Sequence, residues 1–295
     1  MSLAPFRSLL FAPGDAPRKI EKSMASIADG VIFDLEDSVT ESAKSAARDI
    51  VRQTLLSTLD EKKARWVRIN PLTTPHALPD LAAIVGGRPE GILLPKIFGP
   101  KDVILLDHYL TALETQANIA PGHIKILPVA TETPQAVFTL GHFATISARL
   151  IGLTWGAEDL AAAITASTNR DDTGVLSHLY QMARSLCLLG AHAASIRAIE
   201  TAFMDYKNPD AIFSYAARGR KDGFSGMLAI HPDQLEPIHA AFTPSAEDIT
   251  QAQRIIAAFD ANPGAGTVGL DGKMLDMPHL KQARQILDFA KALVP

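Results

Sequence analysis

The chain has 295 residues, of which 47% are hydrophobic and 20% charged, which fits one large globular domain or two ordinary ones. A net charge of -4 and the lack of a dense Lys/Arg block argue against binding to nucleic acid. No apolar run reaches the ~20 residues that cross a bilayer, so we expect no membrane association. The single cysteine, Cys187, and a start without a long apolar signal segment predict a cytoplasmic protein.

Eight short apolar segments are predicted to be buried parallel strands, because most of them lack strict alternation of apolar and polar residues. Amphipathic stretches such as residues 42–59 and 177–190 separate them. This repetition predicts a (β/α)₈ TIM barrel. A doubly wound open sheet is the alternative, but no GxGxxG motif follows the first segment. The predicted strands are residues 7–13, 30–36, 65–70, 91–97, 124–131, 148–155, the Ala-rich 191–198, and 226–232.

The pattern changes after the eighth segment. A helix is predicted from a cap at Thr243 or Ser245, and a second helix is predicted over residues 277–293. The Gly-rich stretch 262–276 between them shows no clear period. We therefore expect a catalytic barrel over residues 1–240. A C-terminal helical extension over 241–295 is expected to pack on the barrel or reach away from it.

Polar residues gather at the predicted carboxyl ends of the strands, where barrel enzymes carry their active sites. Glu132 and Asp159 follow successive strands, and two carboxylates can share a hard divalent cation such as Mg²⁺. Lys96 could form a Schiff base, but no other feature requires one. The pattern predicts a metal-dependent enzyme. The polar residues at these ends include Asp15, Asp34, Glu36, Asp37, Arg68, Asn70, Lys96, Thr131, Glu132, Glu158, Asp159 and His231.

Each candidate also has a purely structural interpretation. Glu132 and Asp159 could be acids at the starts of the following helices. Glu36 and Asp37 could be solvated charges, and Arg68 could form a structural salt bridge with either of them. His residues show no HExxH motif or paired ligand spacing, so zinc is not expected.

A set of motifs then occurs in a specific order from about residue 7 to about residue 290. They are LLFAPGD, IFDLEDSV, VRIN, LLPK, TETP, GAEDL, AIHPDQ, FTPS and DGKMLDMP. In this order they resemble the citrate lyase β-subunit-like family of the aldolase/citrate lyase superfamily. That group includes malyl-CoA, β-methylmalyl-CoA and citramalyl-CoA lyases.

The resemblance implies a (β/α)₈ barrel that forms homo-oligomers, either trimers or hexamers. It implies that Glu132 and Asp159 hold Mg²⁺, the expected cofactor. The expected reaction is reversible cleavage of a 3-hydroxyacyl-CoA into an acyl-CoA and a 2-oxo acid, which are the expected small-molecule partners. The alternatives are a malyl-CoA thioesterase and a citrate lyase β subunit that acts on a carrier-bound citryl thioester.

The resemblance also implies roles for individual side chains. Arg68 would stabilise the thioester enolate, and Arg68 and Glu132 would contact the substrate. Glu36 and Asp37 would hold Arg68 or a metal-bound water in place. Asp276 would act as the acid or base, reaching in from a neighbouring subunit. A helix N-cap is the alternative for Asp276.

Arg7, Arg18 and Lys22 surround the first predicted strand and helix and could meet CoA phosphates. A solvated helix face explains Arg18 and Lys22 equally well. The sequence departs from the family at Met227, where a lysine is common, and over residues 161–174. These departures leave the substrate subtype open.

Overall fold

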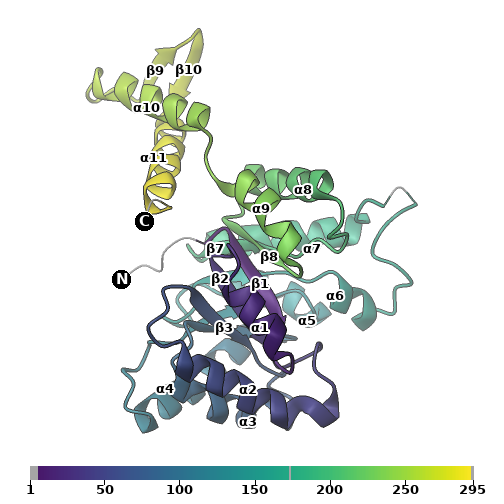
Figure 1. The fold of residues 1–295 in the computed structure, drawn as a ribbon. Coiled ribbons are helices and arrows are strands. Elements are labelled where there is room, and N and C mark those ends of the chain that lie inside the picture. The colour runs from purple at the N-terminus through teal and green to yellow at the C-terminus, as the bar shows by residue number, and fades with distance from the viewer. Residues whose placement is uncertain (1–5, 173, 294–295) are drawn as a thin grey trace.

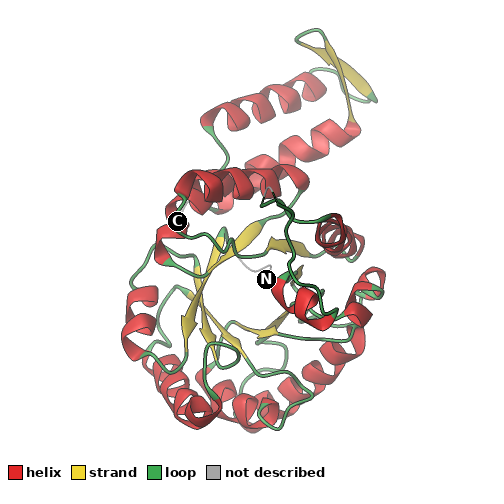
Figure 2. Cartoon of the chain, turned by 90° about the vertical axis from the view of Figure 1, so that its right-hand side faces the viewer, coloured by secondary structure: helices red, strands yellow, loops and turns green. Residues whose placement is uncertain are grey.

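The computed structural model describes residues 6–172 and 174–293, and eight parallel strands form its central barrel (Figures 1 and 2). β1 pairs with both β2 and β8, and the order around the sheet is β5-β4-β3-β2-β1-β8-β7-β6. Isolated bridges from Ile126 to Leu150 and from Val129 to Thr154 join β5 to β6. The prediction of a (β/α)₈ barrel is confirmed. The strands are β1 Ser8–Pro13, β2 Gly30–Asp34, β3 Ala64–Arg68, β4 Gly91–Leu94, β5 Lys125–Pro128, β6 Gly152–Thr154, β7 Arg197–Glu200 and β8 Gly226–Ala229.

Helices surround the strands, as the view along the barrel shows (Figure 2). The α-helices of the barrel are α1 Pro17–Met24, α2 Lys44–Ser57, α3 Ala77–Ile84, α4 Pro100–Gln116, α5 Pro134–Val137, α6 Glu158–Ala163, α7 His178–Ala193, α8 Pro209–Asp222 and α9 Leu235–Phe242. Short 3₁₀ turns are η1 Glu41–Ala43, η2 Val85–Gly87, η3 Leu140–His142 and η4 Pro232–Gln234. No helix in the described part of the chain is both long and apolar enough to cross a membrane.

Apolar side chains fill both the inside of the barrel and the space between strands and helices. One cluster contains Leu9, Ile32, Trp66 and Leu93 from neighbouring strands. A larger cluster packs the outward strand residues against the helices. Because the strands are buried on both faces, their sequences read as continuous apolar runs.

The predicted strand over residues 191–198 is misplaced. Residues 191–193 complete α7, and β7 begins only at Arg197. Alanine is a strong helix former, so the Ala-rich stretch continues the helix instead of starting a strand. β7 takes its apolar core residues from Ala198 and Ile199.

The C-terminal extension forms a separate small unit that stands off the barrel (Figure 1). It consists of α10 Ala246–Asp260, the antiparallel hairpin of β9 Thr267–Leu270 and β10 Lys273–Asp276, and α11 Met277–Ala292. The Gly-rich sequence did not predict the hairpin. Its turn, Asp271-Gly272, has φ values of 51° and 73°, as tight hairpin turns require. Phe259, Val268 and Leu280 form part of the small core of this unit.

The extension leaves the barrel at the amino ends of the strands. Thr243, just after α9, accepts a hydrogen bond of 3.3 Å from the side chain of Arg7, which precedes β1. An ion pair of 2.8 Å between Arg220 and Asp248 also joins α8 to α10. The carboxyl ends of the strands, where the candidate site lies, face the other way.

Candidate active site

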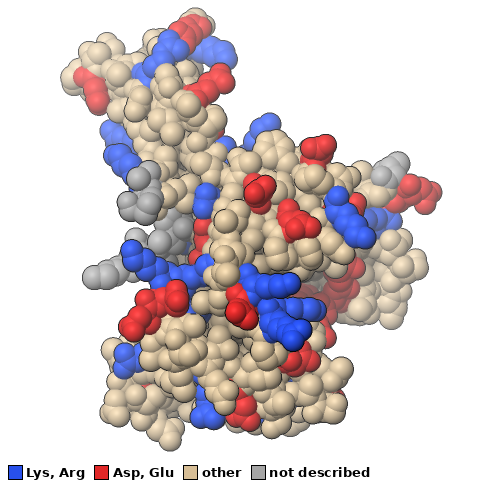
Figure 3. Space-filling view, viewed as in Figure 1, with Lys and Arg blue, Asp and Glu red and all other residues tan. Residues whose placement is uncertain are grey.

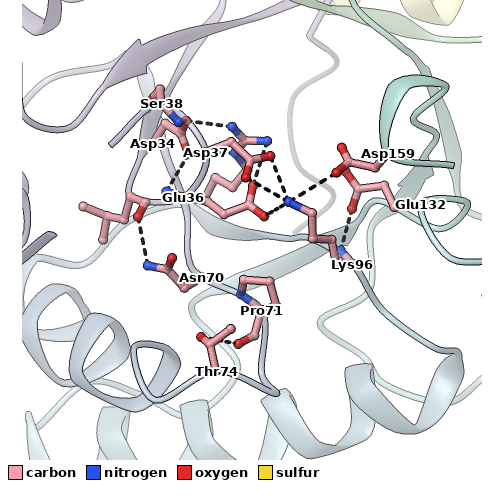
Figure 4. Close-up of polar contacts among 12 residues, drawn as sticks. Asp34, Glu36, Asp37, Ser38, Asn70, Pro71, Thr74, Lys96, Glu132 and Asp159 are labelled. Carbon is pink, nitrogen blue, oxygen red and sulfur yellow. Dashed lines mark hydrogen bonds and ion pairs between the residues drawn. The ribbon is translucent and has the colours of Figure 1, made fainter. Parts of the chain in front are cut away.

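Asp34 at the end of β2 (Figure 4) and Arg68 at the end of β3 form the first part of the site. The two residues are register partners, so their side chains emerge side by side. Arg68 donates two hydrogen bonds of 2.7 Å to the carboxylate of Asp34. Burial would raise the pKa of Asp34, but the hydrogen bonds and charge of Arg68 outweigh it and lower that pKa. The guanidinium is therefore fixed in one orientation.

Glu36 and Asp37 follow β2 and meet the side chain of Lys96, which follows β4. The ammonium Nζ lies 2.5 Å from Glu36 Oε1 and 2.8 Å from Asp37 Oδ2. Glu36 also pairs with Arg68 at 3.0 Å, so it links the two cations. Burial raises the pKa of Glu36 despite these partners.

Lys96 has a backbone φ of 50°, which is uncommon for a residue other than glycine. In this conformation its N–H donates to Glu132 Oε2 at 2.5 Å, while its ammonium lies 3.3 Å from Asp159 Oδ1. Burial would lower the pKa of Lys96, but the surrounding carboxylates raise it instead. The amine is therefore protonated, and the Schiff-base interpretation does not fit this geometry.

Glu132 and Asp159 lie together at the ends of β5 and β6 (Figure 4). Thr131 Oγ1 accepts from the Gly156 N–H at 3.0 Å and donates to the Gly156 carbonyl at 3.2 Å, which fixes the two strand ends together. The carboxyl group of Glu132 is buried. Burial first, and then the charge of Asp159, raise the pKa of Glu132 well above its ordinary value.

The donor set fits a divalent cation of the magnesium type. Acids outnumber cations in the cluster, which leaves negative charge that a metal ion would offset. Among residues 6–172 and 174–293, no three His, Cys, Asp or Glu side chains form a complete metal cage. Mg²⁺ does not need one, because it keeps several waters and commonly uses one or two carboxylates plus the substrate. The acids are Asp34, Glu36, Asp37, Glu132 and Asp159, and the cations are Arg68 and Lys96.

The helix caps and ion pairs around the site bear on the purely structural interpretations of Glu132, Asp159 and Arg68. The cap of α5 is Thr133, whose Oγ1 accepts from the Ala136 N–H at 3.2 Å, so Glu132 does not cap that helix. Asp159 does lie in the first turn of α6, which is compatible with a second role. Arg68 pairs with Glu36, as expected, and more closely with Asp34.

The other predicted residues are not part of the hydrogen-bonded cluster in the described part of the chain. Arg7 is paired with Asp29 at 2.7 Å at the amino end of β1, so the structure does not bring it to the site. Arg18 and Lys22 are exposed on α1. Asp276 lies at the N-cap position of α11, in the extension, where its Oδ1 is 2.5 Å from His279 Nδ1.

Sequence reasoning gave no role to Asp34 and only a doubtful one to Lys96. The signal for Asp34 was an acid at the end of a fully apolar strand, GVIFD, beside Arg68 at the end of the next strand. A buried acid in such a run requires a partner. The sequence placed Lys96 at a strand end but did not identify its ion-pair partners, because they are up to 63 residues away in the sequence.

Comparisons with known proteins agree with this fold and identify the family. The chain belongs to the HpcH/HpaI aldolase/citrate lyase family, whose model matches residues 7–232, and it is therefore an enzyme of that family. Citrate lyase subunit beta of Haemophilus influenzae is 34% identical over 97% of each chain. A (3S)-malyl-CoA thioesterase of Cereibacter sphaeroides is also 34% identical, over 98% of this chain and 96% of its own length.

A solved structure is similar over nearly the whole chain. It is the protein CitE from Mycobacterium tuberculosis in complex with magnesium, acetoacetate and coenzyme A. Its TM-score to this chain is 0.81 at 31% sequence identity, with 98% of this chain and 99% of CitE covered. The similarity extends beyond the barrel and includes the C-terminal extension.

Proposed function

We propose that this enzyme is a Mg²⁺-dependent lyase that cleaves a 3-hydroxyacyl-CoA reversibly to an acyl-CoA and a 2-oxo acid. The observation that carries the proposal is the buried Glu132 beside Asp159, with the oriented guanidinium of Arg68 in the same cluster. The magnesium, acetoacetate and coenzyme A bound to the similar CitE protein support the same assignment. The substrate is of the malyl-, β-methylmalyl- or citramalyl-CoA type.

Glu132 and Asp159 would hold the metal ion. When bound, Mg²⁺ would supply Lewis-acid polarisation of the carbonyl of the 2-oxo acid. Through the metal ion the two carboxylates would fix the position of the oxo acid, and Glu132, which is buried at the strand ends, would lie at the substrate.

Arg68 would stabilise the charge that develops on the thioester. Cleavage breaks the bond between the hydroxyl-bearing carbon and the carbon next to the thioester carbonyl. The hydroxyl gives up its proton to water as the carbonyl of the 2-oxo acid forms, and the electron pair of the broken bond remains as a thioester enolate. A fixed guanidinium stabilises that oxygen without having to reorganise. Asp34 and Glu36 hold Arg68 in this orientation, and Lys96 in turn holds Glu36 and Asp37.

Asp276 would exchange a proton with the enolate carbon from a neighbouring chain. Within its own chain it lies in the extension, which leaves the barrel at the end opposite to Glu132 and Asp159. A homo-oligomer, a trimer or a hexamer, is therefore part of the proposal. Arg18 and Lys22 on α1 remain the predicted contacts for CoA phosphates, and a cytoplasmic location remains a prediction.

Product analysis tests the lyase activity. Purified protein is incubated with malyl-CoA, β-methylmalyl-CoA or citramalyl-CoA in EDTA or in Mg²⁺. We expect acyl-CoA and 2-oxo acid in equal amounts, only with Mg²⁺. Asp159→Asn should abolish the products. Asp210→Asn, a first-turn acid of α8 away from the cluster, should not. Free CoA without acyl-CoA would identify a thioesterase instead. Turnover restricted to a carrier-bound citryl thioester would identify a citrate lyase β subunit.

Mixing two inactive variants tests whether the site is shared between chains. Asp276→Asn and Asp159→Asn proteins are dissociated, mixed and reassociated. If Asp276 acts on a neighbour, about a quarter of the sites in a symmetric oligomer regain both residues and activity returns. Asp288→Asn on the exposed side of α11 should be active by itself. An active Asp276→Asn enzyme would contradict the assigned role.

A further inference from the structure

A cavity of about 370 Å³ lies outside the barrel, between α7, α8 and the residues around Arg170 that precede α7. Its lining includes Arg184 on α7 and Tyr215 on α8. Among the described residues that line it there is no member of the acid and cation cluster at the strand ends. Sites for small molecules have volumes of roughly 300–1,000 Å³. The cavity is therefore large enough to hold a small organic ligand apart from the candidate active site.

The lining of this cavity is basic. It contains the three arginines Arg170, Arg184 and Arg218, and no Asp or Glu among the residues that the structure describes. By contrast, basic and acidic side chains are interspersed over the face of the molecule that Figure 3 shows, which is typical of a solvated surface. Several cations around one concave surface focus a positive potential into it. The lining therefore favours an anionic ligand.

Ion pairs offset the charge of the three arginines only in part. Arg184 lies 2.6 Å from a carboxylate oxygen of Glu200 and 2.7 Å from one of Asp222. Asp222 is also 3.8 Å from Arg218, which is too long for a hydrogen bond. These two carboxylates balance two of the three positive charges, so one positive charge remains. A singly charged anion matches this excess, whereas a doubly charged phosphate ester exceeds it.

Arg170 is held in place by contacts with its own loop. Its Nη1 donates to the Gly174 carbonyl at 2.8 Å, and a backbone bridge joins Arg170 to Leu176. The adjacent acid, Asp171, does not line the cavity and accepts a hydrogen bond of 3.1 Å from the Val175 N–H. A guanidinium has five N–H donors, so the bond to Gly174 leaves Arg170 with capacity to bind an anion.

Aromatic and aliphatic side chains complete the lining. Phe203 packs against Tyr215 with ring centroids 5.2 Å apart, and the guanidinium carbon of Arg170 lies 6.0 Å from the centre of the Phe203 ring. The hydroxyl of Tyr215 already donates to Glu200 at 3.1 Å, so the ring of Tyr215 is the part that contributes to the lining. An apolar lining with a few charged groups is typical of sites for small organic molecules. A matching ligand therefore carries an apolar part beside its negative charge.

We propose that this cavity is a second binding site, which takes a small organic monocarboxylate with an apolar chain or ring. The carboxylate pairs with Arg170 and Arg218, because the planar fork of a guanidinium matches the two oxygens of a carboxylate. The apolar part packs against Phe203 and Tyr215. The metal cluster contributes nothing to this site, so the proposal does not rest on the proposed lyase reaction.

Calorimetry with matched probes tests the chemistry of the ligand. Hexanoate, hexanamide, acetate and inorganic phosphate are each titrated into the full-length protein in EDTA, which keeps the metal site out of the measurement. Hexanoate should bind, and hexanamide, which has the same chain without the charge, should not. Acetate should bind at least about tenfold more weakly than hexanoate, because it lacks the methylene groups that the cavity buries. No binding of hexanoate, equal binding of hexanamide or acetate, or tighter binding of phosphate would overturn the proposal.

Substitutions of the arginines test the place of binding. Arg170→Gln and Arg218→Gln should each weaken hexanoate binding about tenfold, the effect of losing one charge-assisted hydrogen bond. Arg52→Gln, at an exposed position on α2, should leave it unchanged. Asp159→Asn should bind hexanoate as the wild-type protein does, because Asp159 belongs to the other site. Loss of binding in Asp159→Asn together with unchanged binding in Arg170→Gln would move the ligand to the candidate active site and contradict the proposal.

Filling the cavity gives a second readout that leaves the arginines in place. Ala211 on α8 lines the cavity, so the indole of Ala211→Trp should occupy it and abolish hexanoate binding. The same substitution at an exposed position of α2, Ala46→Trp, should not affect binding. Circular dichroism should show wild-type helix content in both variants. Hexanoate binding of wild-type strength in a folded Ala211→Trp protein would show that the ligand does not enter this cavity.

Discussion

Asp34→Asn tests whether the guanidinium of Arg68 is held by a buried ion pair. The substitution keeps the size of the side chain but removes the charge that receives two hydrogen bonds of 2.7 Å. Breaking a buried pair from one side typically costs 3–5 kcal/mol, because the remaining charge stays buried. Glu36 still contacts Arg68 at 3.0 Å, so we expect the lower end, about 3 kcal/mol of unfolding free energy.

The assay is urea denaturation of metal-free protein at neutral pH. Asp37→Asn is the control, because Asp37 is solvent-exposed and its pair with Lys96 should contribute less than about 1 kcal/mol. If Asp34→Asn lowers the unfolding free energy by less than Asp37→Asn does, the ion pair does not hold Arg68 in the way described.

The pH dependence of the same measurement has a definite sign. The pKa of Asp34 is lowered in the folded protein, so its contribution to stability is present above its ordinary value of 3.8 and is lost as the pH falls below it. The difference in stability between wild type and Asp34→Asn should therefore shrink in acid. A difference that grows below this pH would contradict the assigned ionisation.

Three further predictions concern the metal ligands and their neighbours. Because the pKa of Glu132 is raised, metal-free wild-type protein should lose stability as the pH rises above 4.5. In thermal melts, Glu132→Gln should remove that loss of stability. The same variant should bind Mg²⁺ more weakly. Lys96→Gln removes a cation that lies 3.3 Å from Asp159 and that competes with Mg²⁺ for this carboxylate. Calorimetry should therefore show Mg²⁺ binding about fivefold tighter in the variant, and weaker binding would refute the competition between Lys96 and Mg²⁺. Thr131→Val removes both hydrogen bonds to Gly156 and should cost about 1–2 kcal/mol in denaturant unfolding, whereas an unchanged value would show that they contribute little.

The barrel could be predicted from the sequence because its strands are apolar runs at regular spacing. The Ala-rich stretch around residue 191 was misassigned because its apolar run was taken for a strand, although alanine favours the helix and α7 continues to Ala193. The β9–β10 hairpin was missed because it is largely exposed, so no alternation of apolar and polar residues marks it.

The site was predictable to the extent that it depends on strand ends. Glu132, Asp159 and Arg68 lie at the ends of strands that the pattern predicts, and the shared edge of a parallel sheet brings them together. The choice of ion-pair partners was not predictable, because the reach of Lys96 across to Glu36 depends on its left-handed backbone. Nothing in a single sequence reports that conformation.

Binding of a 2-oxo acid to the metal-loaded protein tests the central claim most directly. Pyruvate, glyoxylate and oxaloacetate are titrated into wild-type protein and Glu132→Gln by calorimetry, with Mg²⁺ and with EDTA. The account predicts that at least one acid binds wild type with Mg²⁺, and that this binding is lost in EDTA and in Glu132→Gln. Equal binding with and without the metal would contradict the claim that Glu132 and Asp159 hold the oxo acid through Mg²⁺.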